Sequence, residues 1–210
     1  MKYTTIPHTD IRVSKICLGT MTWGNQNTQN EGFEQMDYAL DAGVNFFDTA
    51  ELYPVPATAD TYADTERIMG DWYASRKNRD KVVLATKIAG PGAYTAHIRT
   101  TGFTPNSIRE ALEGCLMRLK TDYIDLYQLH WPERNANFFG KRDYFPDADE
   151  QWQDNFQQIL ETLNGFIQEG KIRHIGLSHE TPWGAMKYVA LAEHKSLPRM
   201  KTIQDQSKDM

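Results

Sequence analysis

Short apolar runs alternate along the chain with longer segments in which apolar residues recur at every third or fourth position. A short run bounded by Gly or polar residues is typical of a buried strand, and the three-to-four spacing is typical of one face of a helix. The predicted strands cover residues 15–20, 44–49, 82–87, 123–130 and 172–178. The predicted helices cover residues 33–42, 66–75, 105–119, 156–170 and 183–194. This alternation predicts a parallel sheet with helices outside it.

Two architectures satisfy the alternation, the closed (β/α)8 barrel and the open doubly wound sheet. A doubly wound sheet that binds dinucleotides carries a Gly-x-Gly-x-x-Gly turn after its first strand. Residues 19–24, which follow the first predicted strand, read Gly-Thr-Met-Thr-Trp-Gly and lack that spacing. We therefore expect an α/β protein with a TIM (β/α)8 barrel, preceded by a short β-hairpin over residues 3–5 and 12–13.

The charge and cysteine counts exclude several classes of function. The chain has 23 Lys and Arg against 28 Asp and Glu, a net charge of −5, so it offers no basic surface for nucleic acid. No apolar stretch reaches the roughly 18 residues that span a bilayer, and residues 1–5 lack the apolar centre of a signal peptide. Cys17 and Cys115 are too few for a disulfide framework, and no histidine pair has metal-binding spacing. We expect a cytoplasmic protein with two buried thiols, no metal, and no membrane partner.

Four ionisable residues lie at or just beyond the ends of predicted strands, namely Asp48, Tyr53, Lys87 and His130. Taken singly, each has an ordinary structural explanation as a turn, packing or solvated residue. The strand ends of one barrel converge on one mouth, however, so the four together predict a single site in which they shift one another's pKa values.

Proton donation to a carbonyl is the chemistry that suits this set. An unperturbed Tyr has a pKa near 10, and a Lys87 ammonium held by Asp48 is expected to lower the pKa of Tyr53. His130 can donate a hydrogen bond to the substrate oxygen. Side chains supply no hydride, so a cofactor is required. A Schiff-base lyase that uses Lys87 is an alternative, but it needs a Lys without a close carboxylate, which Asp48 argues against.

Several motifs resemble those of the aldo-keto reductase family, in that family's order and spacing. They are Phe46-Phe-Asp48-Thr-Ala50 followed by Tyr53, Ala85-Thr-Lys87, residues 122–130, and Gly176-Leu-Ser178. His130-Trp-Pro132, Phe139-Gly-Lys141 and residues 170–178 resemble the bacterial Tas-like branch of the family.

The resemblance implies an NADPH-dependent barrel that reduces aldehydes and ketones without a metal. It makes Tyr53 the general acid, Lys87 and Asp48 the residues that tune it, and His130 the residue that orients the carbonyl. It assigns the following residues to the cofactor: Thr20, Met21, Gln26, Asp48, Ser178, His179 and Gln204. His179 stands where the family usually has Asn; both side chains offer a donor and an acceptor, in different geometries.

The resemblance covers residues 1–204 as one barrel domain, followed by a polar tail over 205–210 that is unlike the family. We expect about six of the eight strand–helix units, and hence a C-terminally truncated barrel without the loops that hold the cofactor's phosphates. Two hypotheses follow: a carbonyl reductase, or a catalytically impaired relative that binds cofactor or a partner without turnover. The loop over 131–150 is expected to form a wall of the substrate pocket.

Overall fold

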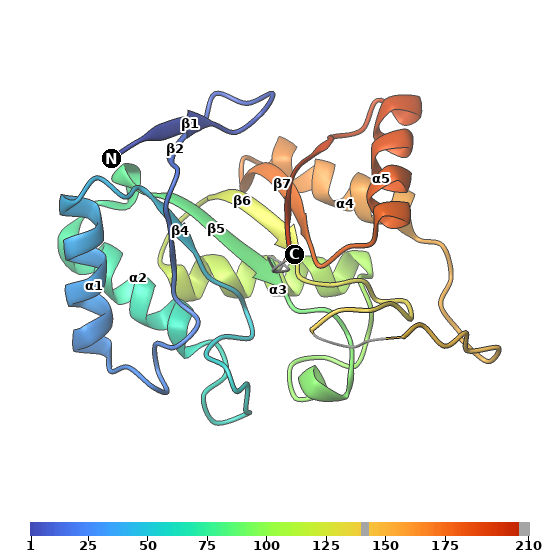
Figure 1. Ribbon diagram of the computed structural model, residues 1–210, viewed down its shortest axis with the longest axis horizontal. Helices are drawn as coiled ribbons and strands as arrows, with labels where there is room; N and C mark the ends of the chain where they lie inside the picture. The colour runs from blue at the N-terminus through green and yellow to red at the C-terminus, as the bar shows by residue number, and fades with distance from the viewer. Residues whose placement is uncertain (140–142, 206–210) are drawn as a thin grey trace.

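The structure is a computed structural model that describes residues 1–139 and 143–205 (Figure 1). Six parallel strands form one sheet in which spatial order follows chain order. They are β3 (Cys17–Gly19), β4 (Phe46–Asp48), β5 (Val83–Ile88), β6 (Ile124–Leu129), β7 (Ile172–Ser178) and β8 (Met200–Gln204). The five predicted strands are thus confirmed, and β8 is the sixth strand of the sheet.

Five helices connect these strands and confirm the predicted helical segments. They are α1 (Gln29–Asp41), α2 (Asp64–Arg76), α3 (Pro105–Leu119), α4 (Phe156–Gln168) and α5 (Pro182–Lys195). Two single turns of 3-10 helix, Arg79–Lys81 and Ala93–Thr95, interrupt the loops. Helix α1 begins before its predicted start because Thr28 and Glu31 form a capping box, which satisfies backbone N–H groups ahead of the apolar stripe. Thr104 and Thr181 cap α3 and α5, each followed by Pro as the first helical residue.

The predicted hairpin is also present. Strands β1 (Tyr3–Thr5) and β2 (Arg12–Ser14) pair antiparallel, with Tyr3 opposite Ser14. The apolar residues Ile6, Ile11 and Val13 pack against the partly buried Phe46 and Val83, the first residues of β4 and β5. The hairpin therefore covers the N-terminal end of the sheet and leaves the opposite end, where the strands finish, for the site.

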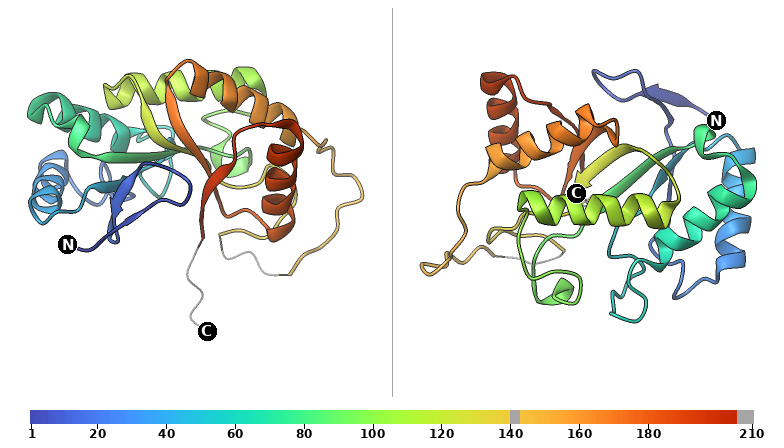
Figure 2. Two further views of the ribbon diagram at one scale, coloured as in Figure 1. Left: turned by 90° about the horizontal axis from the view of Figure 1, so that it is seen from above. Right: turned by 180° about the vertical axis from the view of Figure 1, so that it is seen from behind.

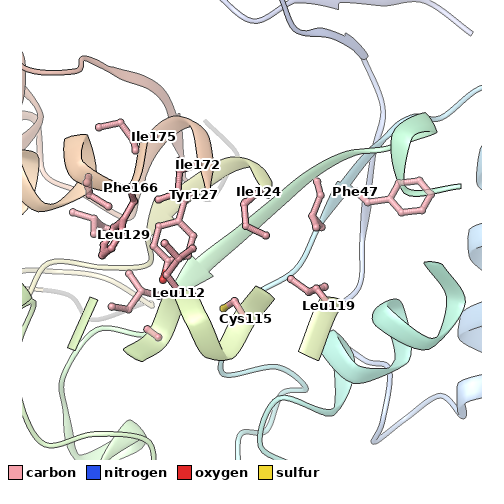
Figure 3. Close-up of a cluster of buried hydrophobic side chains, with 14 of the residues drawn as sticks. Phe47, Leu112, Cys115, Leu119, Ile124, Tyr127, Leu129, Phe166, Ile172 and Ile175 are labelled. Atoms are coloured by element: carbon pink, nitrogen blue, oxygen red, sulfur yellow. The ribbon is translucent and has the colours of Figure 1, made fainter. Parts of the chain in front are cut away.

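The hydrophobic core lies between the sheet and the helices. Figure 3 shows side chains of α3 and α4 meeting those of the strands; the buried residues drawn there include Phe47, Leu112, Cys115, Leu119, Ile124, Tyr127, Leu129, Phe166, Ile172 and Ile175. Burying a side chain of this size stabilises the fold by about 1.5–3 kcal/mol. The helices cover the convex face of a curved sheet (Figure 2), as in part of a barrel wall.

Within the described residues the sheet is an open, curved part of a barrel, with β3 and β8 as its edge strands. The predicted incomplete (β/α)8 barrel is confirmed in this form. The expectation of two buried thiols is wrong for Cys17, which is exposed, while Cys115 is buried. The reason is topological: β3 has a neighbour on one side only, so its residues are less covered than in a closed barrel.

Several predicted segments carry no regular structure or lie outside the description. The loop 131–150 contains no helix or strand over 131–139 and 143–150. Of the Phe139-Gly-Lys141 motif only Phe139 is described, and of the predicted polar tail only Asp205. In the part of the chain that the structure describes, no helix is long and apolar enough to cross a membrane.

Candidate active site

The ends of β4 and β5 bring Asp48 and Lys87 into direct contact. Asp48 lies opposite Ala85 in the parallel pair, so Lys87 follows two residues later on the same face of the sheet. Its Nζ donates to Asp48 Oδ2 at 2.6 Å and to the Thr49 carbonyl oxygen at 2.8 Å. Burial alone would lower the pKa of Lys87, but the Asp48 carboxylate and the Tyr53 phenol outweigh it and raise the pKa above its usual value. Lys87 is therefore a buried ammonium.

Tyr53 lies beside this ammonium, in the loop that follows β4. Lys87 Nζ is 5.2 Å from the centre of the Tyr53 ring. Burial raises the pKa of Tyr53 above its usual value, and Lys87 opposes only part of that rise. The expected lowering of the Tyr53 pKa is therefore wrong for this structure, because the lost hydration of the phenolate outweighs the attraction of the cation.

His130 follows β6 and faces Tyr53. The two rings meet edge to face with their centres 5.8 Å apart. Burial, Lys87 and His179 together hold the pKa of His130 well below its usual value, so the imidazole is neutral at pH 7 and carries one N–H. Its Nδ1 is buried and has no hydrogen-bond partner among the described residues.

Ser178 and His179 stand at the end of β7, close to His130. Ser178 Oγ is 2.8 Å from His179 Nδ1, which lies 3.3 Å from the His130 carbonyl oxygen. His179 has a φ of 50°, in the left-handed region where Asn, Asp and His are enriched among non-glycine residues. The backbone at this position thus accommodates His where the family usually has Asn.

Gln204, the last residue of β8, reaches back to the ion pair. Its Nε2 lies 3.3 Å from Asp48 Oδ2, and its Oε1 accepts from Gln128 Nε2 at 3.2 Å. The carboxylate of Asp48 is therefore surrounded by one ammonium and two amides, since Gln128 Nε2 also lies 3.5 Å from Asp48 Oδ1.

The remaining residues assigned to the cofactor lie after β3. Met21 is exposed and lines the pocket described below. The buried Thr20 hydroxyl donates to the Asp48 carbonyl oxygen at 2.9 Å, and Gln26 is exposed in the turn. Neither Thr20 nor Gln26 lines that pocket, so their contact with a cofactor stays a prediction.

A pocket of about 490 Å³ opens above Tyr53 and His130. Its apolar lining residues are Met21, Leu52, Val55, Tyr94 and Phe139, and its polar ones are Tyr53, His130, His179, Gln204 and Asp205. Phe139 comes from the loop predicted to form a wall of the substrate pocket, so this loop contributes to the pocket, and substrate binding there stays a prediction. None of the described residues that line the pocket is Lys or Arg.

Two residues near the site escaped the sequence analysis. Gln128 is a buried polar residue inside the apolar strand β6, and its position two residues before His130 puts both on one face, which is a readable signal. Glu51, in the segment Asp48-Thr-Ala-Glu-Leu-Tyr53, is also buried. A single Glu between strand and loop gives little signal in the sequence, because such residues are usually solvated.

Comparison with known proteins identifies the family. The model of the aldo/keto reductase family matches residues 15–206. The chain is similar to protein tas of Escherichia coli (strain K12), with 42% identity over 98% of this chain and 60% of that protein. It is also similar to the uncharacterized oxidoreductase YrpG of Bacillus subtilis (strain 168), with 37% identity over 97% of this chain and 57% of the relative.

The fold is likewise similar to that of a solved reductase. The crystal structure of the thermostable aldo-keto reductase Tm1743 with the inhibitor epalrestat has a TM-score of 0.70 and 23% identity, over 99% of this chain and 63% of that one. The chain spans about 60% of the length of the curated relatives that it matches. These matches show that the chain belongs to the aldo/keto reductase family of oxidoreductases.

Proposed function

We propose that the protein is an NADP(H)-dependent reductase of aldehydes and ketones in which Tyr53 is the general acid. The observation that carries the proposal is the buried ion pair of Lys87 and Asp48 beside Tyr53, a residue that lines a largely apolar pocket. A buried charged pair next to a phenol is costly to build and suits proton transfer at a developing oxyanion.

The residues at the ends of β7 and β8 suit a nicotinamide. Ser178, His179 and Gln204 offer hydroxyl, imidazole and amide groups; His179 contacts the His130 carbonyl oxygen and Gln204 contacts Asp48. A carboxamide needs both donors and acceptors. A bound reduced nicotinamide would supply the hydride that side chains cannot. His179 and Gln204 both line the pocket, which supports placing the ring there.

Tyr53 would donate its hydroxyl proton to the carbonyl oxygen as that oxygen gains charge. The raised pKa keeps the resting phenol protonated at neutral pH. The Lys87 ammonium, fixed by Asp48, stabilises the phenolate that proton donation leaves behind. A well-placed general acid contributes about 10²–10⁴-fold to the rate.

Neutral His130 would donate a hydrogen bond to the same carbonyl oxygen. One imidazole nitrogen carries a proton because the pKa lies well below the usual value. The edge-to-face contact with Tyr53 sets the angle between the two donors. Apolar pocket walls exclude water and so strengthen both hydrogen bonds.

The test is NADPH binding and carbonyl reduction by the purified 210-residue chain. NADPH binding is followed by fluorescence, and turnover by loss of NADPH absorbance with 4-nitrobenzaldehyde. Tyr53→Phe is expected to bind NADPH and lose at least about 10²-fold in kcat. Tyr38→Phe, on the exposed surface of α1, is the matched control. Absence of both binding and turnover in the unsubstituted, folded chain would refute the proposal for this chain.

A further inference from the structure

We propose that Glu51 and Arg99 are positioning residues that clamp the Tyr53 loop onto the strand carrying Lys87. The inference rests on the proposed function for its catalytic consequence, but its structural part stands independently. Residues 49–63, which carry Tyr53, contain no helix or strand. Outside any helix or strand, this loop is held by single backbone hydrogen bonds, such as those from Tyr53 N–H to the Ala50 carbonyl oxygen and from Val55 N–H to the Met21 carbonyl oxygen, both 3.0 Å, and by side-chain contacts.

Glu51 supplies those contacts from within the loop. The Glu51 side chain is 1% exposed. Its carboxylate accepts from both terminal nitrogens of Arg99, and the distance from Arg99 Nη1 to Glu51 Oε2 is 2.8 Å. It also accepts from the Ala89 backbone N–H at 2.9 Å and from the Tyr62 hydroxyl at 3.1 Å. The Glu51 backbone N–H donates to the Lys87 carbonyl oxygen at 3.0 Å. One residue thus ties the Tyr53 loop directly to Lys87 and to the residue that follows β5.

Arg99 closes the clamp from a third segment, the loop between β5 and α3. Its guanidinium donates to the Ala89 carbonyl oxygen at 3.1 Å as well as to Glu51. The same loop carries Tyr94, whose hydroxyl accepts from the Ala57 N–H at 2.8 Å and whose ring lines the pocket. The Tyr53 loop is therefore held by this segment at two places, on either side of Tyr53.

The chemistry of the pair argues for positioning more than for stability. A buried ion pair often contributes little net stability compared with an apolar pair of the same size. A guanidinium paired with a carboxylate through two hydrogen bonds, however, fixes direction as well as distance. Tyr53 needs both, because its ring must stay 5.2 Å from Lys87 Nζ and edge-on to His130.

A second buried pair in the same protein provides a matched control. Glu66 is 0% exposed and pairs with Arg118, and it accepts from the Thr86 hydroxyl at 2.7 Å. This pair links α2 and α3 to β5. The Arg118 guanidinium also lies 5.4 Å from the centre of the Tyr62 ring, but among the described residues neither side chain of the pair makes a hydrogen bond to the Tyr53 loop. Glu66→Gln therefore perturbs a Glu–Arg pair that is as buried as the Glu51–Arg99 pair. The Glu66 carboxylate contacts Thr86, the neighbour of Lys87 in β5.

The experiment compares Glu51→Gln, Arg99→Lys and Glu66→Gln with the unsubstituted chain. Amide hydrogen exchange is measured at Glu51, Tyr53 and Ala89, with the core amide of Leu126 as the reference for global opening. In Glu51→Gln the three loop amides are expected to exchange about 10-fold faster relative to Leu126. Arg99→Lys keeps the charge and is expected to show a smaller increase, and Glu66→Gln none.

The kinetic arm separates this inference from the proposed function. Glu51→Gln is expected to lower kcat by about 10²-fold with little change in KM or NADPH affinity. Glu66→Gln is expected to leave kcat unchanged when kcat is calculated per folded molecule. If the unsubstituted chain does not turn over, the proposed function fails, and the exchange rates alone test whether Glu51 and Arg99 hold the Tyr53 loop. The inference is overturned if the loop amides exchange at the same rate relative to Leu126 in Glu51→Gln and Glu66→Gln. It is also overturned if Glu51→Gln leaves the kcat of an active chain unchanged.

Discussion

Replacing Lys87 by Met tests the electrostatic account of the site most directly. Met has a similar length and no charge, so the change removes the ammonium and leaves the volume largely filled. With an effective dielectric constant of about 20, a unit charge 5.2 Å from the Tyr53 ring centre stabilises a phenolate there by about 3 kcal/mol. If most of the charge develops in the transition state, that energy corresponds to about 10²-fold in kcat. The sign is fixed: losing a cation raises the pKa of Tyr53 further above its usual value.

The assay is steady-state reduction of 4-nitrobenzaldehyde, together with NADPH affinity and thermal unfolding. Lys87→Met leaves the Asp48 carboxylate buried without its cation, which is expected to cost about 3–5 kcal/mol of folding stability. The double variant Lys87→Met with Asp48→Asn removes that unpaired charge and is expected to recover stability without recovering kcat. Lys120→Met, which breaks an exposed ion pair with Asp71, is the control. A loss in kcat below about 10-fold in the folded double variant would refute the reasoning.

Three further predictions follow from particular residues. The folded-state pKa of His130 is well below 6.5, so as the pH falls the unfolded chain binds a proton that the folded chain does not bind. The free energy of unfolding measured with urea should therefore fall as the pH drops below about 6.5. His130→Gln should reduce this pH dependence. Phe166, which is 1% exposed in the core, should cost about 3–5 kcal/mol when replaced by Ala, measured by the same unfolding curves; a cost near zero would show that α4 does not pack as described. Since none of the described residues that line the pocket is Lys or Arg, 4-carboxybenzaldehyde should have a kcat/KM at least about 10-fold below that of 4-nitrobenzaldehyde, and a preference for the carboxylate would contradict this lining.

The sequence predicted the architecture well because strands and helices have periodic signals of their own. Each apolar run forms a strand, and Asp48 and Lys87, which the strand-end rule predicts to lie at one mouth, are in direct contact. The rule holds because the carboxyl ends of parallel strands all lie at the same end of the sheet, whatever the conformation of the loops between them.

What the sequence did not predict depends on burial in loops, which have no periodicity. The direction of the Tyr53 pKa shift follows from how deeply residues 49–63 cover the phenol, and no spacing in that segment encodes it. The hydrogen bond from the Thr20 hydroxyl to the Asp48 carbonyl oxygen likewise depends on the three-dimensional distance between β3 and β4, while the assignment of Thr20 to the cofactor stays a prediction. Cys17 is exposed because β3 is an edge strand of the described sheet, and the cysteine count alone does not indicate that position.

The order of the strands in the sheet bears on how the site assembles. In the six-stranded sheet each strand from β4 to β8 pairs with the strand before it in the chain, so pairing can proceed from the N-terminus as the polypeptide leaves the ribosome, and each step needs only strands already made. The Asp48–Lys87 pair needs only β4 and β5 and can form early. The contact between Asp48 and Gln204 spans 156 residues and must wait for β8. The proton-donating half of the site is thus expected to exist before the half assigned to the nicotinamide, and a nascent chain halted before β8 would carry the first without the second.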